Sequence, residues 1–385
     1  GSIKAGESII RFNHEGETSQ HRVAQLFGFT GLGRVELQEA HAGDIIAMTG
    51  ISDVLVGETL AHPSVTEPLP VITIEEPAMK MTFRVNDSPF AGREGQFVTS
   101  RQIRERLFRE VETNVALKVE DGESAEQFIV SGRGELHLAI LVETMRREGY
   151  EFAVTRPEVI IHDGPHGKEE PFERLFVEAP DSSTGFLIET LSGRKAQMVG
   201  MHQDHNGNVR LDFEVPTRGL IGFRDTFISG TGGEGIMNTE YLGYRPWAGE
   251  ITRHRNGALV ASETGTALSF GIANAQERGM MFISPGDEVY GGMVVGLHAK
   301  DTDLDVNVCK AKQLTNIRSS TSDIAVKLVP PSPPSLERSL SLIGNDEMVE
   351  VTPKTLRIRK IELNPTIRAR ESKRQRYAAM EAANA

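Results

Sequence analysis

Cysteine is nearly absent from this chain, since Cys309 is the one cysteine in 385 residues. A single thiol cannot form an internal disulfide or supply a cysteine-rich metal site, so the fold must be stabilised by packing. Long apolar runs are also missing, because no stretch approaches the roughly 18 consecutive apolar residues of a membrane helix. The N-terminus does not have the basic, apolar and small-residue order of a signal peptide. We therefore expect a cytoplasmic protein with no membrane partner.

Catalytic signatures are absent as well. The chain has no G-x-x-x-x-G-K-[ST] phosphate loop, no H-E-x-x-H zinc helix and no G-x-S-x-G nucleophile elbow. Residues 230–235 have the letters of G-x-G-x-x-G, but they follow a predicted helix and precede a predicted strand, the reverse of a dinucleotide site. The pairs His162 with His166 and His202 with His205 have no third ligand at an obvious spacing. We expect no catalytic residue, no metal and no cofactor in this chain.

Acidic residues outnumber basic ones, with 54 Asp and Glu against 42 Lys and Arg and a net charge of −12. This average speaks against a protein that is coated with nucleic acid. The charge is uneven, however, because residues 353–376 hold nine basic and two acidic side chains, a local charge of +7 that leaves −19 elsewhere. Such asymmetry indicates one cationic end that meets a polyanion, on an acidic body that limits unspecific binding.

The length of 385 residues is too great for a single core, and 38% hydrophobic residues suffice to build several. The chain opens at Gly1-Ser2 without a methionine and enters a strand-like segment at once, which is typical of a fragment. Short β-rich runs and glycine-containing turns follow. We expect a small β-barrel over residues 1–72, with the proline-bearing stretch 61–70 as an extended linker.

The next unit alternates between strands and helices. Its predicted elements are strand 80–85, helix 100–112, strands 115–119 and 127–130, helix 135–148 and strand 151–155. Gly149 follows the second helix, as a helix-ending glycine does. The order β-α-β-β-α-β predicts a ferredoxin-like domain over residues 73–160.

The same order recurs further along the chain. The predicted elements are strand 174–177, helix 185–197, strand 209–215 after a hairpin turn at 206–207, helix 218–228 and strand 236–244. We expect a second ferredoxin-like domain over residues 168–246. The two tandem units predict a duplicated architecture within a multidomain α+β protein.

After Trp247 the pattern becomes mainly β, with strand-like runs at 267–270, 293–297 and 324–329. A long polar segment, 300–323, lies between the last two, and a loop of that size is usually functional or disordered. A proline-rich connector, a short helix at about 336–343 and the basic region end the chain. We expect a mainly-β C-terminal domain over residues 247–385 with a long basic loop.

Two features of this last domain point to RNA. The polar segment carries cations among small hydroxyl and amide residues, a mixture that contacts phosphates and 2′-hydroxyls: Lys300, Lys310, Lys312 and Arg318. In the basic stretch we expect a strand face lined by cations and then a basic helix: Arg357, Arg359 and Lys360, followed by Arg368, Arg370, Lys373, Arg374 and Arg376. A solvated loop and a solvated tail remain the alternatives, since four aspartates oppose the cations of the polar segment.

Several segments resemble a known protein family. The stretch S-G-R-G-E-L-H-L at 131–138 resembles the signature of the third domain of elongation-factor-G-like translational GTPases, and residues 43–50 are similar to the end of their second-domain barrel. Residues 216–224 resemble the fifth-domain segment in a form typical of the BipA/TypA proteins. Residues 312–318 and 349–353 are similar to parts of a C-terminal domain peculiar to that family.

The resemblance implies a cytoplasmic GTPase that binds the ribosome and acts in ribosome assembly, translation and stress or cold adaptation. It implies that GTP, GDP or ppGpp binds with Mg²⁺ in an N-terminal G domain, which is missing here. The implied partners are ribosomal RNA, the A-site tRNA region and the protein's own G domain, and the implied state is a monomer. We therefore expect a C-terminal fragment that binds the ribosome and hydrolyses no GTP.

The residues alone leave a second hypothesis open, a small-molecule-binding regulatory protein built on tandem ferredoxin-like domains. A third, hydrolase chemistry at the histidine-rich turns, has no assembled set of catalytic groups. Co-sedimentation with ribosomes distinguishes the first hypothesis from the second.

Overall fold

The computed structural model describes residues 1–52, 54–70, 77–165, 167–203, 207–251, 256–311, 327–371 and 373–374. Two compact units are distinguished, one that contains the N-terminal residues to 75 and one that contains most of the chain from residue 76 onward. Each is described by itself. None of the helices in the described ranges is long and apolar enough to cross a membrane.

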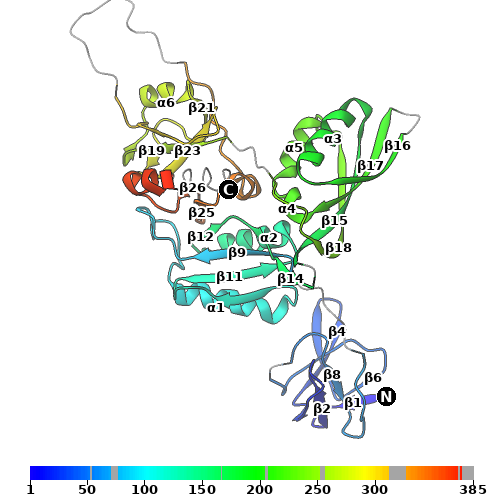
Figure 1. The fold of residues 1–385 in the computed structure, drawn as a ribbon. Coiled ribbons are helices and arrows are strands. Elements are labelled where there is room, and N and C mark those ends of the chain that lie inside the picture. Colours follow the sequence, from blue (N-terminus) through cyan, green and yellow to red (C-terminus); the bar gives the residue numbers. More distant parts are fainter. Residues whose placement is uncertain are drawn as a thin grey trace, which may run out of the picture. The chain divides into compact units, whose positions relative to one another are not determined.

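The first unit is built from short strands (Figure 1). These are β1 (Ser2–Lys4), β2 (Ser8–Phe12), β3 (Thr18–Arg22), β4 (Leu26–Thr30), β5 (Gly33–Leu37), β6 (Glu39–His41), β7 (Ile46–Met48) and β8 (Thr59–Ala61). They pair in the orders β3-β2-β8, β5-β4-β7 and β1-β6 around a small core of Ile9, Val23 and Leu26. The β-rich character of this region is as expected, and a closed barrel over residues 1–72 stays a prediction.

The second unit begins with the element order β-α-β-β-α-β that the sequence predicts. Its elements are β9 (Met79–Arg84), α1 (Ser100–Thr113), β10 (Lys118–Asp121), β11 (Gln127–Gly132), α2 (Glu135–Arg147) and β12 (Phe152–Thr155), with β13 (Glu158–Val159) beside β9. The strands lie antiparallel in the order β10-β11-β9-β12. The predicted helical stripes are buried, since Leu107 and Leu138 have no exposed surface, and Gly149 ends the second helix with a φ of +96°.

The element order recurs between residues 167 and 246. Its elements are β15 (Gly167–Pro180), α3 (Thr184–Gly193), β16 (Gln197–Gln203), β17 (Asn208–Pro216), α4 (Thr217–Leu220), α5 (Phe223–Gly230) and β18 (Ile236–Pro246), with β14 (His162–Gly164) and a short 3-10 turn (Asp181–Ser183) at its edges. The strand order β16-β17-β15-β18 matches the order β10-β11-β9-β12 of the first copy position by position.

Two helices of this second copy differ from expectation. The helix predicted over 218–228 is divided into α4 and α5, because Gly222 lies between them with a φ of +69°, which a continuous helix does not accommodate. The helix predicted to reach residue 197 ends at Gly193, and Lys195 has a φ of +65°. Residues from Gln197 onward form β16 instead, the hairpin partner of β17.

The remaining chain forms mixed strands and helices. These are β19 (Ala258–Ala261), β20 (Gly265–Thr266), α6 (Ser269–Gln276), β21 (Gly279–Met281), β22 (Glu288–Val289), β23 (Met293–His298), β24 (Leu304–Val306), α7 (Leu336–Leu342), β25 (Glu347–Val351) and β26 (Leu356–Lys360), followed by helical residues 365–371. The strand predicted at 267–270 is wrong, because α6 starts at Ser269 and buries Ile272 and Ala275 on one face. Of the run 324–329, the residues before Lys327 lie outside the described ranges.

One sheet continues across the boundary that we predict at residue 247. Strand β12 pairs antiparallel with β25, from Phe152 opposite Val351 to Thr155 opposite Met348. The sheet therefore runs β10-β11-β9-β12-β25-β26-β23-β19-β24. Each residue of β25 is buried, charged Glu347 and Glu350 included, so this strand lies at the centre of a joint core.

Candidate nucleic-acid interface

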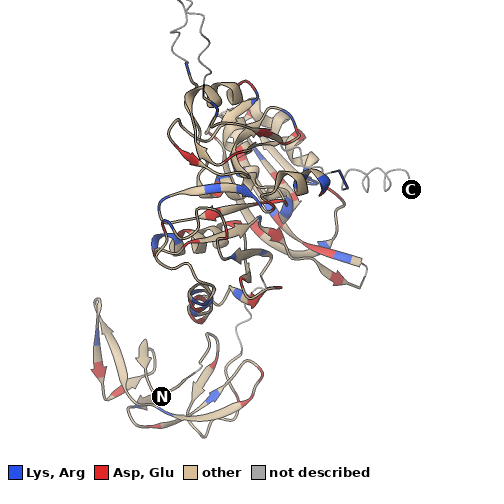
Figure 2. Ribbon diagram, turned by 90° about the vertical axis from the view of Figure 1, so that its left-hand side faces the viewer, with Lys and Arg blue, Asp and Glu red and all other residues tan. Residues whose placement is uncertain are grey.

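The predicted cations divide into exposed and buried groups. The exposed residues are Lys300 and Lys310, at the two ends of the segment that holds β24, and Arg370, Lys373 and Arg374 near the C-terminus. Figure 2 marks lysine and arginine in blue, also on the helix that leads to the C-terminal end. Lys312, Arg318 and Arg376 lie outside the described residues.

The basic helix begins where the sequence gives it a start signal. The Asn364 side chain accepts a hydrogen bond from the Thr366 backbone N–H at 2.9 Å, and Pro365 is the first helical residue. Arg368 turns back toward the domain, where it donates to Asp305 Oδ1 at 2.8 Å and to the Leu363 carbonyl at 2.6 Å. Arg368 thus attaches the helix, while residues further along are exposed.

Lys360 is enclosed by carboxylates. Its Nζ lies 2.5 Å from Asp303 Oδ2, 2.7 Å from Asp346 Oδ2 and 2.9 Å from Glu347 Oε1, and its side chain is 2% exposed. Burial alone lowers the pKa of the Lys360 amine, but the nearby carboxylates outweigh it and raise that pKa above its ordinary value. This ammonium group is therefore charged, internal and already partnered.

Arg357 and Arg359 are also engaged inside the domain. Arg357 donates to Glu350 Oε1 at 3.1 Å and to Glu94 Oε1 at 2.5 Å. Arg359, whose side chain is 1% exposed, pairs with Asp87 and donates to the Lys360 carbonyl at 3.2 Å. The prediction of a surface strand face lined by Arg357, Arg359 and Lys360 is wrong in exposure, because these side chains are at most 13% exposed and pair with carboxylates of the same compact unit.

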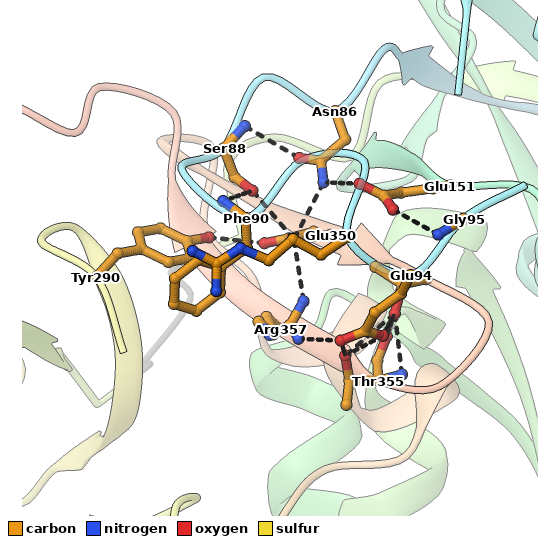
Figure 3. A network of polar contacts seen from close by, with 12 residues as sticks. Asn86, Ser88, Phe90, Glu94, Gly95, Glu151, Tyr290, Glu350, Thr355 and Arg357 are labelled. Carbon is orange, nitrogen blue, oxygen red and sulfur yellow. Dashed lines mark hydrogen bonds and ion pairs between the residues drawn. The ribbon is translucent and has the colours of Figure 1, made fainter. Parts of the chain in front are cut away.

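Figure 3 shows the polar network that surrounds Glu350. Oε1 of its fully buried carboxylate accepts from Asn86 Nδ2 at 3.0 Å and from Ser88 Oγ at 3.1 Å, and Oε2 accepts from the Tyr290 hydroxyl at 2.7 Å. Burial, then the Glu350 charge, raises the pKa of Tyr290, so this hydroxyl stays protonated as a donor. The network joins the loop after β9 to β25, β26 and the residues before β23.

Two further carboxylates complete this network. Glu151 accepts from the Gly92 and Gly95 backbone N–H groups at 2.7 and 2.9 Å. Glu94 accepts from the hydroxyls of Thr352 and Thr355. Burial raises the pKa of Glu94, but the Thr352, Arg357 and Thr355 donors outweigh it and hold this pKa below its usual value.

Sequence reasoning missed this network, although one signal for it was present. Glu347 and Glu350 lie three residues apart in one short segment, and Arg357 and Lys360 lie three residues apart in the next, with which it forms a hairpin. In the observed register Glu350 lies opposite Arg357, and Glu347 lies opposite Lys360. Charges of opposite sign at matching positions of adjacent strands indicate cross-strand ion pairs.

The segment at 216–224 holds a second charged cluster. Arg218 pairs with buried Glu170, with 3.0 Å between Nη2 and Oε1, and donates to the Gly249 carbonyl. Its guanidinium lies 3.7 Å from the centre of the Trp247 ring. Arg218 therefore attaches the chain after β18 to the sheet that contains β15.

Two histidines, His162 of the pairs considered as ligands and His137 of the 131–138 signature, have structural roles. His162 stacks on Tyr244 with 4.1 Å between ring centres. At the start of α2, His137 Nδ1 accepts from the Arg133 backbone N–H at 3.3 Å, which holds the glycine-rich turn of the 131–138 signature. Among the described residues, no group of three or more His, Cys, Asp or Glu side chains is placed to hold a metal ion.

Comparison with known proteins gives three family matches. Residues 256–365 match the TypA/BipA C-terminal domain, residues 168–255 the elongation factor G C-terminus, and residues 98–156 elongation factor G domain III. The match of 256–365 covers β19 to β26 and therefore the buried cations of β26 and two of the exposed cations, Lys300 and Lys310.

Three relatives carry the name large ribosomal subunit assembly factor BipA. The protein of Synechocystis sp. is 52% identical over 361 residues, which are 94% of this chain and 60% of that protein. The Bacillus subtilis protein is 47% identical over 99% of this chain and 62% of its own length. The Salmonella typhimurium protein is 43% identical over 98% and 62%, respectively. This chain thus spans about three fifths of the length of these relatives, and over nearly its whole length it is similar to proteins of the TypA/BipA family.

Proposed function

We propose that this chain is the ribosome-binding part of a large-subunit assembly factor and that it binds ribosomal RNA, near the A-site tRNA region, through its C-terminal domain. This proposal depends on one observation, that some cations of the C-terminal domain are paired with carboxylates and others are exposed. Carboxylates take up Arg357, Arg359, Lys360 and Arg368, whereas Lys300, Lys310, Arg370, Lys373 and Arg374 are exposed. From their sequence positions alone, we include Lys312, Arg318 and Arg376 in the proposal, although they lie outside the described residues.

The exposed cations suit contact with phosphates. A Lys or Arg that neutralises a phosphate releases counterions, so binding weakens steeply as salt rises. Such contacts position a protein on RNA without reading its bases. Because the relatives are named large ribosomal subunit assembly factors, we propose the ribosome as the polyanion that these cations bind.

The rest of the activity follows from the family resemblance. We infer that GTP hydrolysis with Mg²⁺, and binding of GDP or ppGpp, belong to parts of the longer relatives that this chain does not cover. The chain itself acts by binding, as a monomer in the cytoplasm, and the longer protein serves assembly, translation and stress or cold adaptation.

Co-sedimentation with purified large ribosomal subunits tests the proposal. We expect the parent chain to pellet with the subunits and the variant Lys300→Ala/Lys310→Ala/Arg370→Ala to bind about 10-fold or more weakly in 0.1 M salt, since each lost phosphate contact removes counterion release. The matched control removes three exposed cations from residues 77–160, as Arg101→Ala/Lys118→Ala/Arg147→Ala. Equal losses in both variants, or an unchanged affinity of the first, would refute the proposed surface.

A further inference from the structure

Two aspartates lie among the cations of the proposed RNA surface. Asp303 and Asp305 flank Leu304 in β24, between Lys300 and Lys310. On charge alone, each aspartate opposes binding to a polyanion. Their contacts show a different use, because both carboxylates face cations that are held by the domain rather than exposed cations.

Asp303 connects three parts of the fold. Its Oδ2 lies 2.5 Å from Lys360 Nζ at the end of β26, and its Oδ1 accepts from the Ala258 backbone N–H at 2.8 Å at the start of β19. The carbonyl oxygen of Thr302, the residue before it, is hydrogen-bonded to His298 Nδ1 at 2.5 Å. The chain that leaves Lys300 is thus attached to β19, β23 and β26 within a few residues.

Asp305 makes the second attachment. Its Oδ1 accepts from Arg368 Nη2 at 2.8 Å, and Arg368 belongs to the basic helix. The Arg368 side chain is 15% exposed and that of Asp305 is 49% exposed. This pair joins the segment of Lys310 to the helix of Arg370, Lys373 and Arg374, two cation-bearing parts that are far apart in the sequence.

We propose that Asp303 and Asp305 are positioning residues for RNA binding: paired with Lys360 and Arg368, they clamp the segment of Lys300 and Lys310 to the domain and to the basic helix. The inference rests on the proposed function. Two acidic side chains then strengthen the binding of a polyanion, because a clamped set of cations loses less conformational entropy on binding than a mobile one.

The sign of one substitution separates this clamp from simple electrostatics. Asp305→Asn removes a negative charge, so a surface governed by net charge binds large ribosomal subunits more tightly. The clamp predicts the opposite, an affinity for the subunits that is about fivefold lower, a change comparable to the contribution of a well-formed ion pair. Arg368→Lys, which keeps the charge opposite Asp305, is expected to retain most of the affinity, whereas Arg368→Gln loses as much as Asp305→Asn.

Asp301→Asn is the matched control. Asp301 is exposed, lies beside Lys300 and forms no ion pair with the described residues. The control removes the same charge without touching the clamp, so affinity stays equal or rises. An Asp305→Asn variant that binds as tightly as the parent chain, or that behaves like Asp301→Asn, overturns the proposal.

Hydrogen exchange distinguishes failure of the clamp from failure of the proposed function. The Ser262 and Leu268 N–H groups donate to the Val306 and Val308 carbonyls at 3.0 and 2.9 Å, so they report on how firmly this segment is held. We expect faster exchange at both amides in Asp305→Asn and parent-like exchange in Asp301→Asn. If the parent chain does not bind subunits, the proposed function fails, and unchanged exchange in Asp305→Asn refutes the clamp in either case.

Discussion

Glu350 and Arg357 lie directly opposite each other in the antiparallel strands β25 and β26, and Arg357 donates to the Glu350 carboxylate at 3.1 Å. The pair is internal, since the Glu350 side chain has no exposed surface and that of Arg357 is 13% exposed. A buried charge without its partner is costly, so each member requires the other. The pair also sits where residues from the loop after β9 meet the C-terminal strands.

Glu350→Gln is expected to destabilise the chain by about 3 kcal/mol, because the amide leaves Arg357 less compensated and places new donors against existing donors. Tyr290→Phe removes a single hydrogen bond from the same carboxylate and is expected to cost about 1 kcal/mol. Urea unfolding followed by circular dichroism measures both variants. Equal effects of the two substitutions would contradict a central role for the Glu350 charge.

Glu143 gives a pH-dependent contribution to stability. Arg146, followed by Arg147, lowers the pKa of Glu143 to about 2 against the opposing effect of burial. A carboxyl whose pKa is lower in the folded state stabilises above its unfolded pKa, and this stabilisation disappears as the pH falls through the folded value. The parent chain should therefore be more stable than Glu143→Gln at pH 7, with the difference closing between about pH 4.5 and 2. A difference that stays constant across this range argues against the assignment.

Arg218→Lys tests the cluster around Trp247. Lysine keeps the charge but not the two-point contact with Glu170 or the planar stack on the indole ring, so we expect a loss of about 2 kcal/mol. Trp247 is the one tryptophan of the sequence, and its fluorescence therefore reports on this site directly. We expect a shifted emission maximum in the folded variant. Emission identical to that of the parent chain would show that the stack does not order the ring.

Arg370→Gln and Arg359→Gln separate exposed from buried cations. The first is expected to weaken binding to large ribosomal subunits and flatten its salt dependence, with unfolding changed by less than about 0.5 kcal/mol. The second removes a buried partner of Asp87 and is expected to destabilise the fold by about 2 kcal/mol or more. Thermal unfolding and salt-dependent binding measure the two effects. Equal stabilities of the two variants would contradict the assignment of Arg359 as a buried, paired cation and Arg370 as an exposed one.

Regular periodicity made the helices and strands of the first βαββαβ copy predictable, whereas in the second copy one predicted helix is too long and the other is divided at Gly222. Helix α2 combines an apolar stripe with a terminal glycine, and both signals are local. The strand predicted at 267–270 is wrong because a run of four residues is too short to distinguish a strand from the first turn of a helix. In the structure these residues lead into α6, which buries Ile272. Local sequence also gives no indication that β12 and β25 pair, since they are almost 200 residues apart.

The candidate site was predictable in composition but not in exposure. The charge count over residues 353–376 includes the cations of β26. It misses their partners Asp346, Glu347 and Glu350, which come just before that stretch. Other partners, Asp87 and Glu94, lie more than 250 residues away along the chain. Tertiary pairing therefore decides which basic side chains remain at the surface.

The backbone ladder between β12 and β25 has a mechanical consequence. The hydrogen bonds of an antiparallel pair run perpendicular to its strands, so a force along the strands is shared among all of them. A force on the C-terminal strands is therefore transmitted through the β12–β25 pair to the strands β9 to β11.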